Sequence, residues 1–224
     1  RILACAQVAR HRGQGHVGNR GVQHLHDRRQ HDRQRDHGVV PVGDHAHTEH
    51  GRRTGEAGLT TPMQSADFGQ LTALLALVSQ NDVIVHSGPL YAATESLIAR
   101  ILSRFGVSFV DFPAGANRKQ LDKILAEAQR LAKKKGGKVA LVYLESPANP
   151  TNALVDVEAV RAARDAAFPG AQKPAIAIDN TFLGPLWQQP IKQGAELVVY
   201  SLTKYAGGHS DLVAGGVCGS QALI

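Results

Sequence analysis

The most informative segment of the chain is Leu197-Val-Val-Tyr-Ser-Leu-Thr-Lys-Tyr-Ala-Gly-Gly-His-Ser-Asp211. Its first four residues are apolar and predict a buried strand, which ends in two small hydroxyl residues, a lysine and a glycine pair. A second apolar run, Ala175 to Ile178, ends in Asp179-Asn-Thr-Phe182. In open α/β sheets, ligands bind beyond the carboxyl ends of such strands. The two segments therefore predict a binding edge that carries a lysine and a carboxylate.

From about Thr61 onward, the chain alternates between helical and strand patterns. We expect helices over 65–78, 94–102, 117–135 and 157–167, a short helix between 178 and 197, and strands over 82–85, 107–110, 138–144, 175–178 and 197–200. Thr94 is the expected N-cap of the second helix, and Asn117 with Gln120 forms a capping-box pattern. Gly106 and the pair Gly136-Gly137 are expected to end helices. Continuous apolar strands between helices predict an α/β fold with a doubly wound, mostly parallel sheet covered on both faces.

Lys204 and Asp179 together fit one kind of chemistry. A lysine can form a Schiff base with pyridoxal phosphate, and a carboxylate can keep the pyridine nitrogen protonated so that the ring accepts electrons. Taken singly, each has an ordinary interpretation: Lys204 as a solvated lysine after a strand, and Asp179 as a cap of a helix or turn. Gly207 and Gly208 permit an unusual backbone path or a close approach to a ligand.

Three blocks carry a resemblance to a known family: Glu145-Ser-Pro-Ala-Asn-Pro-Thr151, Asp179-Asn-Thr-Phe182 and Ser201-Leu-Thr-Lys-Tyr-Ala-Gly-Gly-His-Ser-Asp211. From about Ser65 to Ser220 the chain resembles the pyridoxal-phosphate-dependent enzymes of Cys/Met metabolism. This family includes cystathionine γ-synthase, cystathionine lyases, methionine γ-lyase and O-acetylhomoserine sulfhydrylase. The resemblance implies the large domain of a fold-type I enzyme that eliminates or replaces a Cβ or Cγ substituent of sulfur amino acids such as cystathionine, methionine or O-acylhomoserine.

The resemblance also implies a role for each matching residue. Lys204 is the implied Schiff-base lysine and proton carrier, Asp179 the partner of the pyridine nitrogen, Ser201 and Thr203 phosphate ligands, Asn149 the donor to the phenolic oxygen, and Tyr91 the ring-stacking tyrosine that assists proton transfer. Tyr91 could instead be a core tyrosine with a satisfied hydroxyl. Glu145 either contacts the substrate or shapes the end of its strand.

The chain departs from the family at several points. The phosphate-binding turn, Ser-Gly-Met in the family, is Ser65-Ala66-Asp67 here, so that Ala66 and Asp67 lie at the expected phosphate site. The carboxylate of Asp67 would repel a phosphate, although backbone amides at the helix N-terminus could still donate. The family's Tyr-Gly-Gly-Thr is Tyr91-Ala-Ala-Thr94. Residues 1–60 do not match the family's intersubunit arm, and the C-terminal domain with the substrate-binding arginine is expected beyond Ile224.

The first quarter of the chain has an atypical composition. Residues 1–53 contain ten arginines and five acids, and nine of the eleven histidines lie before residue 61, whereas the remainder is nearly neutral. We therefore expect residues 1–60 to be a disordered or non-native Arg/His-rich segment, and residues 61–224 to be the cofactor-binding domain. Two other interpretations are a basic tail that contacts nucleic acid, ranked last, and a metal site in Asp44-His-Ala-His-Thr-Glu-His50. No metal is expected in the catalytic site.

Composition narrows the remaining possibilities. Two cysteines cannot form a disulfide framework, and no apolar run approaches the about 20 residues of a membrane span, so a cytoplasmic enzyme without membrane contact is expected. Through the resemblance, the partners are an amino-acid substrate and further copies of the chain in a homodimer or homotetramer. The alternatives are a catalytically incompetent fragment of such an enzyme, or another fold-type I enzyme such as an aminotransferase.

Overall fold

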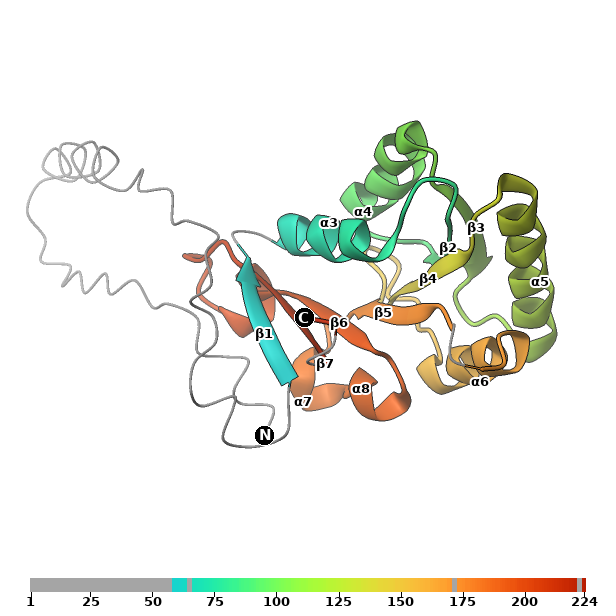
Figure 1. Cartoon of the computed structure of the whole chain (residues 1–224). Coiled ribbons are helices and arrows are strands. Elements are labelled where there is room, and N and C mark those ends of the chain that lie inside the picture. Colours follow the sequence, from blue (N-terminus) through green and yellow to red (C-terminus); the bar gives the residue numbers. More distant parts are fainter. Residues whose placement is uncertain (1–57, 64–65, 171–172, 221–222) are drawn as a thin grey trace, which may run out of the picture.

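The computed structural model describes residues 58–63, 66–170, 173–220 and 223–224, and its side chains from Gln70 onward (Figure 1). The predictions made for residues 1–57, including the possible metal site at Asp44–His50 and the basic tail, lie outside these described residues. So does Ser65 of the expected phosphate-binding turn.

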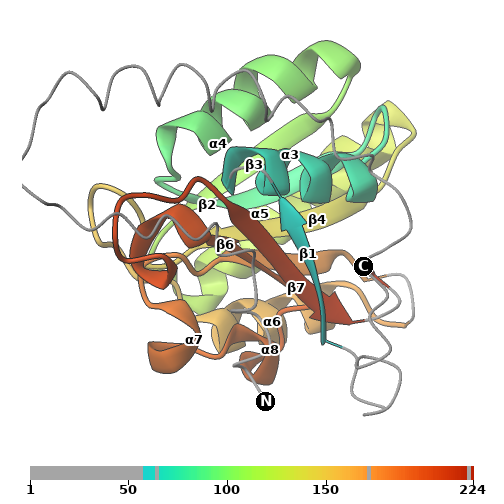
Figure 2. The same cartoon turned by 90° about the vertical axis from the view of Figure 1, so that its left-hand side faces the viewer.

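One sheet contains all seven strands of the described part, in the order β1-β7-β6-β5-β4-β2-β3. The strands are β1 (Gly58–Met63), β2 (Val83–Gly88), β3 (Ser108–Pro113), β4 (Val139–Glu145), β5 (Ala175–Asp179), β6 (Leu197–Ser201) and β7 (Gly215–Ser220). Five neighbouring strands, β3, β2, β4, β5 and β6, are parallel, whereas β7 is antiparallel to β6 and β1 is antiparallel to β7. Figure 2 shows β1 lying along β7 at this end of the sheet. The predicted mostly parallel sheet is confirmed.

Helices connect the strands and lie on both sides of the sheet. They are α3 (Ala66–Leu77), α4 (Ala92–Ser96), α5 (Arg118–Lys135), α6 (Val157–Ala167), α7 (Gly184–Trp187) and α8 (Pro190–Gln193), together with a π-helical turn η2 (Leu97–Ile101), a 3₁₀ turn η3 (Leu102–Phe105) and a second π-helical turn η4 (Leu202–Ala206). Figure 1 shows α3 and α4 on one side of the sheet and α5 and α6 on the other.

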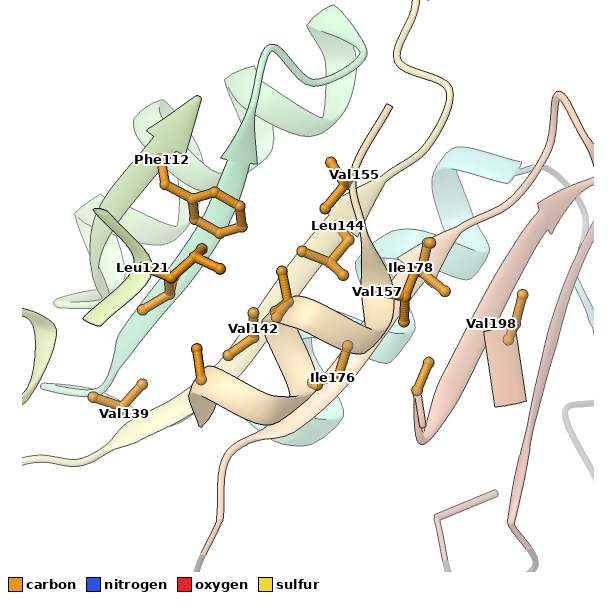
Figure 3. Packing of buried hydrophobic residues seen from close by; sticks show 14 of the residues in the cluster. Phe112, Leu121, Val139, Val142, Leu144, Val155, Val157, Ile176, Ile178 and Val198 are labelled. Carbon is orange, nitrogen blue, oxygen red and sulfur yellow. The ribbon is translucent and has the colours of Figure 1, made fainter. Parts of the chain in front are cut away.

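Alternate residues of the central strands face two separate cores. On one side Val142, Ile176 and Val198 pack with α5 and α6, as Figure 3 shows for the labelled members of this cluster. On the other side Leu141 and Ala177 pack against α3 and the segment 97–107. Every residue of β4 is buried, as expected for a parallel strand covered on both faces.

Several local predictions are confirmed. Helix α5 begins with a capping box, in which the Asn117 side chain accepts from the Gln120 amide at 3.0 Å and the Gln120 side chain accepts from the Asn117 amide at 2.9 Å. It ends at Gly136, which has φ +73°, and η3 ends at Gly106, which has φ +86°. Helix α6 spans the predicted residues 157–167.

The prediction of Thr94 as an N-cap is wrong. The N-cap of α4 is Tyr91, and Thr94 is a buried residue inside the helix. Its hydroxyl does not cap the backbone but donates to Gln70 Oε1 at 2.6 Å. The expected continuous helix over 94–102 is also wrong in form, because α-helical geometry ends at Ser96 and gives way to η2 and η3.

Two features of the strands were not anticipated. The antiparallel strands β1 and β7 were not predicted, and β1 begins at Gly58, so the sheet includes residues on both sides of the boundary expected at about residue 60.

Among the described residues, no helix has the length and apolar character needed to cross a membrane.

Candidate active site

The carboxyl ends of β4, β5 and β6 surround a cavity of about 190 Å³ on the side of the sheet that α3 covers. The cavity is lined by Gln70, Tyr91, Glu145, Pro147, Asn149, Asp179, Thr181, Phe182, Ser201, Thr203, Lys204 and Val213. After β2 the chain continues to β3 on one side, whereas after β4 it continues to β5 on the other side, so the connections diverge between β2 and β4. Tyr91, which follows β2, and Glu145, which ends β4, both line the cavity. The cavity therefore lies at the topological switch point, where open α/β sheets bind ligands.

The structure brings together six of the eight residues predicted for the site. Tyr91, Asn149, Asp179, Ser201, Thr203 and Lys204 all line this cavity. The other two, Ala66 and Asp67, form the start of α3, and their side chains lie outside the described part. The alternative interpretation of Tyr91 as a core residue is wrong, because 38% of the residue is exposed.

Lys204 lies in an irregular segment that continues directly from β6. It lies inside the π-helical turn η4, but its own backbone is not helical, with φ −89° and ψ −125°. Two glycines follow as expected: a Cβ on Gly207 would lie 2.8 Å from the Leu202 carbonyl oxygen, and Gly208 has φ +77°. This path leaves the Lys204 side chain exposed at the cavity wall, where it is accessible to a ligand.

Asp179 is held rigidly at the end of β5. The residue is 7% exposed, its Oδ1 accepts from the Thr181 amide at 2.9 Å, and its Oδ2 accepts from Gln70 Nε2 at 2.5 Å. Gln70 is itself fixed by the hydrogen bond from Thr94. A carboxylate that accepts a hydrogen bond on each of its oxygens is kept in one orientation. Asp179 is therefore suited to hold a cationic group in the cavity.

The hydroxyl residues after β6 have different surroundings. Ser201 is 8% exposed, and its amide donates to Thr181 Oγ1 at 2.8 Å. Thr203 Oγ1 donates to the Ala214 carbonyl at 3.2 Å and accepts from the Ala214 amide at 2.9 Å. Ser201 thus presents a hydroxyl at the cavity, whereas the Thr203 hydroxyl ties the lysine segment to the residue before β7.

Among the residues that line the cavity, Glu145 has a pKa that its surroundings shift strongly. It pairs in register with Asp179 on the adjacent strand and is 4% exposed. Burial, followed by the negative charge of Asp179, raises the pKa of Glu145 from 4.5 to about 7, although two backbone amide donors lower it. Below it, the pKa of Tyr143 is raised by burial and by the charges of Asp179 and Glu145.

Sequence reasoning missed two residues of the site. Gln70 and Thr181 orient Asp179 through hydrogen bonds, and Thr181 also joins β6 to the segment after β5. Thr181 lies in the quoted block Asp179-Asn-Thr-Phe182, where a hydroxyl two residues after an acid is a recognisable turn signal. Gln70 offers only the weaker signal of a polar residue within an apolar helix.

The cavity contains the groups that pyridoxal phosphate requires. It has an amine that can bond to the aldehyde, a fixed carboxylate, an aromatic ring on a partly exposed residue, a side-chain amide and a buried hydroxyl. Within the described residues there is no cluster of His, Cys, Asp and Glu side chains that could hold a metal ion.

Comparisons with known proteins also point to pyridoxal phosphate. The family model described as Cys/Met metabolism PLP-dependent enzyme, where PLP is pyridoxal phosphate, matches residues 54–223. The chain is 35% identical over 173 residues to an L-methionine gamma-lyase of Pseudomonas putida, covering 76% of this chain and 38% of that protein. It is 31% identical over 160 residues to the cystathionine beta-lyase MetC of Staphylococcus haemolyticus, covering 71% of this chain and 37% of that protein.

Solved structures are similar as well. The crystal structure of metB from Corynebacterium glutamicum superposes with a TM-score of 0.62 at 27% identity, covering 75% of this chain and 39% of that one. A protein from Campylobacter jejuni assigned as O-acetylhomoserine (thiol)-lyase (metY) gives a TM-score of 0.63 at 25% identity, covering 75% and 38%, and its structure carries N′-pyridoxyl-lysine-5′-monophosphate. The chain spans less than half the length of these relatives.

Proposed function

The chain belongs to the Cys/Met metabolism PLP-dependent enzymes, and from this premise we propose that its cavity binds pyridoxal phosphate through Lys204. We further propose that the whole protein eliminates or replaces a Cβ or Cγ substituent of sulfur amino acids. The observation that carries the proposal is that Tyr91, Asn149, Asp179 and Lys204, which come from four separate segments, line one cavity.

When bound, the cofactor supplies an electron-accepting ring that stabilises negative charge next to the substrate amine. Asp179 would pair with the ring nitrogen and keep its proton in place, because Gln70 and Thr181 fix both of its oxygens. Tyr91 would stack on the ring, and the Asn149 side chain would donate to the ring oxygen. Lys204 would hold the cofactor through its side-chain amine, and that amine, when free, would move a proton at the substrate Cα carbon.

For the phosphate, we propose Ser201 as the principal side-chain donor. The Thr203 hydroxyl is engaged with Ala214, so it would have to exchange that bond to reach a phosphate. Backbone amides at the start of α3, around Ala66 and Asp67, would add donors, as helix N-termini do for anions.

We also propose that the whole protein works as a homodimer or homotetramer. Several large apolar residues are strongly exposed: Val213, which lines the cavity, at 71%, Tyr205, next to Lys204, at 72%, and Leu186 and Trp187 of α7 at 78%. Exposed apolar side chains gathered near a binding site are typical of surfaces that another chain covers.

Two other interpretations differ in their support. The two sequence relatives named above are described as lyases, so an aminotransferase has no supporting observation. A chain that folds but cannot hold the cofactor stays open to test, since the matched region is less than half of each relative.

The test is attachment of the cofactor. The chain is mixed with an equimolar amount of pyridoxal phosphate, reduced with borohydride and mapped by peptide mass spectrometry. A pyridoxyl group concentrated on Lys204, and absent from the exposed Lys192 of α8, supports the proposal. Modification spread evenly over the surface lysines would contradict it.

A further inference from the structure

Glu145 makes two hydrogen bonds whose geometry links separate parts of the cavity. Its Oε2 accepts from the Tyr91 amide at 2.6 Å, and its Oε1 accepts from the Asn149 amide at 2.8 Å. The residue is 4% exposed, and its own amide donates to Ser87 Oγ at 3.1 Å. One buried carboxylate at the end of β4 thus holds two loops.

These loops carry the residues proposed to contact the cofactor ring. Tyr91 is the N-cap of α4, so its amide has no partner within that helix, and 38% of the residue is exposed. Asn149 lies in the turn between β4 and α6. Apart from the hydrogen bond to Glu145, no contact among the described residues ties the Tyr91 backbone to the end of β4.

We propose that ionised Glu145 is a positioning residue, which holds the loops of Tyr91 and Asn149 at the spacing that the cofactor ring requires. This inference rests on the proposed function for its purpose, although the two hydrogen bonds are properties of the chain alone. The role assigned to Glu145 is the support of these two loops, because each of its carboxylate oxygens accepts a hydrogen bond from one of their backbone amides.

The charge state of Glu145 decides how well it can act. The ionisable groups that face it are Asp179 on β5, Tyr143 below it on β4, Tyr91 before α4, and Lys204 across the cavity. Because the pKa of Glu145 is about 7, both oxygens are free to accept above neutrality. Below neutrality one oxygen carries a proton, and that oxygen is a poor partner for an amide donor. The hydrogen bond from Glu145 to one of the two loops therefore weakens as pH falls through about 7.

Amide hydrogen exchange measures the strength of these two hydrogen bonds without any cofactor. In Glu145→Gln, the shape is kept but an NH₂ group replaces one acceptor, so exchange at Tyr91 or Asn149 should be faster by about tenfold or more. Amides within β4, such as that of Val142, should keep their protection. Glu127→Gln makes the same chemical change at an exposed position of α5 and should change neither amide.

The unmodified chain provides a second measurement that needs no variant. After correction for intrinsic exchange, protection of the Tyr91 and Asn149 amides should increase as pH rises from 6 to 8. Equal protection in wild type and Glu145→Gln, or protection that is independent of pH, would overturn the proposal.

A cofactor titration separates this inference from the proposed function. The dissociation constant for pyridoxal phosphate should be about tenfold higher for Glu145→Gln than for wild type and Glu127→Gln. Equal dissociation constants in wild type and Glu145→Gln would overturn the positioning role. If wild type does not bind pyridoxal phosphate, the proposed function fails, and exchange of the two amides still decides whether Glu145 holds the loops.

Discussion

Replacing Glu145 by glutamine should remove a pH dependence from the stability of the folded chain. The pKa of Glu145 is about 7 in the folded state and near its ordinary value of 4.5 in the unfolded chain. Between these values the folded state holds the proton more tightly. The contribution to stability is therefore fully present below about pH 4.5 and is lost as pH rises through about 7.

The size of this effect follows from the difference in pKa. Each pKa unit corresponds to about 1.4 kcal/mol, so complete ionisation of Glu145 costs the folded state about 3 kcal/mol. Part of that change has already occurred at pH 5, because the carboxyl of the unfolded chain is then mostly ionised. The measurable loss between pH 5 and pH 8 is accordingly about 2–3 kcal/mol.

Urea unfolding at a series of pH values measures the effect. The difference in unfolding free energy between wild type and Glu145→Gln cancels the titration of all other groups and should change by about 2–3 kcal/mol from pH 5 to pH 8, with wild type losing stability. Glu127→Gln, at an exposed site, should follow wild type across the series. A difference between wild type and Glu145→Gln that stays constant with pH would refute the electrostatic account of this carboxylate.

Three further changes test other parts of the structure. Asp179→Asn removes the charge that Gln70 and Thr181 hold in place, so a cofactor titration should show binding weakened by about tenfold or more. Lys204→Ala should abolish the borohydride-fixed pyridoxyl adduct while leaving the circular dichroism spectrum unchanged, because the side chain is exposed. Gly137→Ala should lower the unfolding free energy by about 1–3 kcal/mol in urea unfolding, because its Cβ would lie 2.1 Å from the Asn81 carbonyl oxygen.

The sequence predicts the parallel part of the sheet and much of the site because both depend on local patterns. Apolar runs specify the buried strands, and the residue after each run lies at the carboxyl edge of the sheet. Asp179 and Lys204 could therefore be placed near each other before their contacts were known. The capping box at Asn117 is equally local, since it is complete within four residues.

The antiparallel strands could not be predicted in the same way. β7 reads Gly215-Gly-Val-Cys-Gly-Ser220, which lacks a continuous apolar run. Glycine is nevertheless required there, because a Cβ on Gly219 would lie 2.5 Å from Leu197 Cδ2 and 2.9 Å from the Glu196 carbonyl oxygen. Close packing against β6 replaces side-chain burial as the reason for the strand, and that packing is visible only in three dimensions.

The contacts that tune the site are also long-range. Gln70 and Asp179 are 109 positions apart, and Tyr91 and Glu145 are 54 apart. The expected cap role of Thr94 was wrong for the same reason: its hydroxyl bonds to Gln70 across a helix pair rather than to its own backbone. Local propensity identifies a residue able to form a hydrogen bond, whereas the tertiary fold determines its partner.

The pairing of Glu145 with Asp179 connects stability to the proposed function. The charge on Glu145 costs the folded state about 3 kcal/mol at alkaline pH, yet the charged form is the one that accepts from both loops. A ligand at about one hundred times its dissociation constant stabilises a folded protein by about 2.7 kcal/mol. Binding of pyridoxal phosphate at that concentration would therefore offset most of the cost, and the folded chain should depend on its cofactor most strongly at the pH values where Glu145 holds Tyr91 and Asn149 in place.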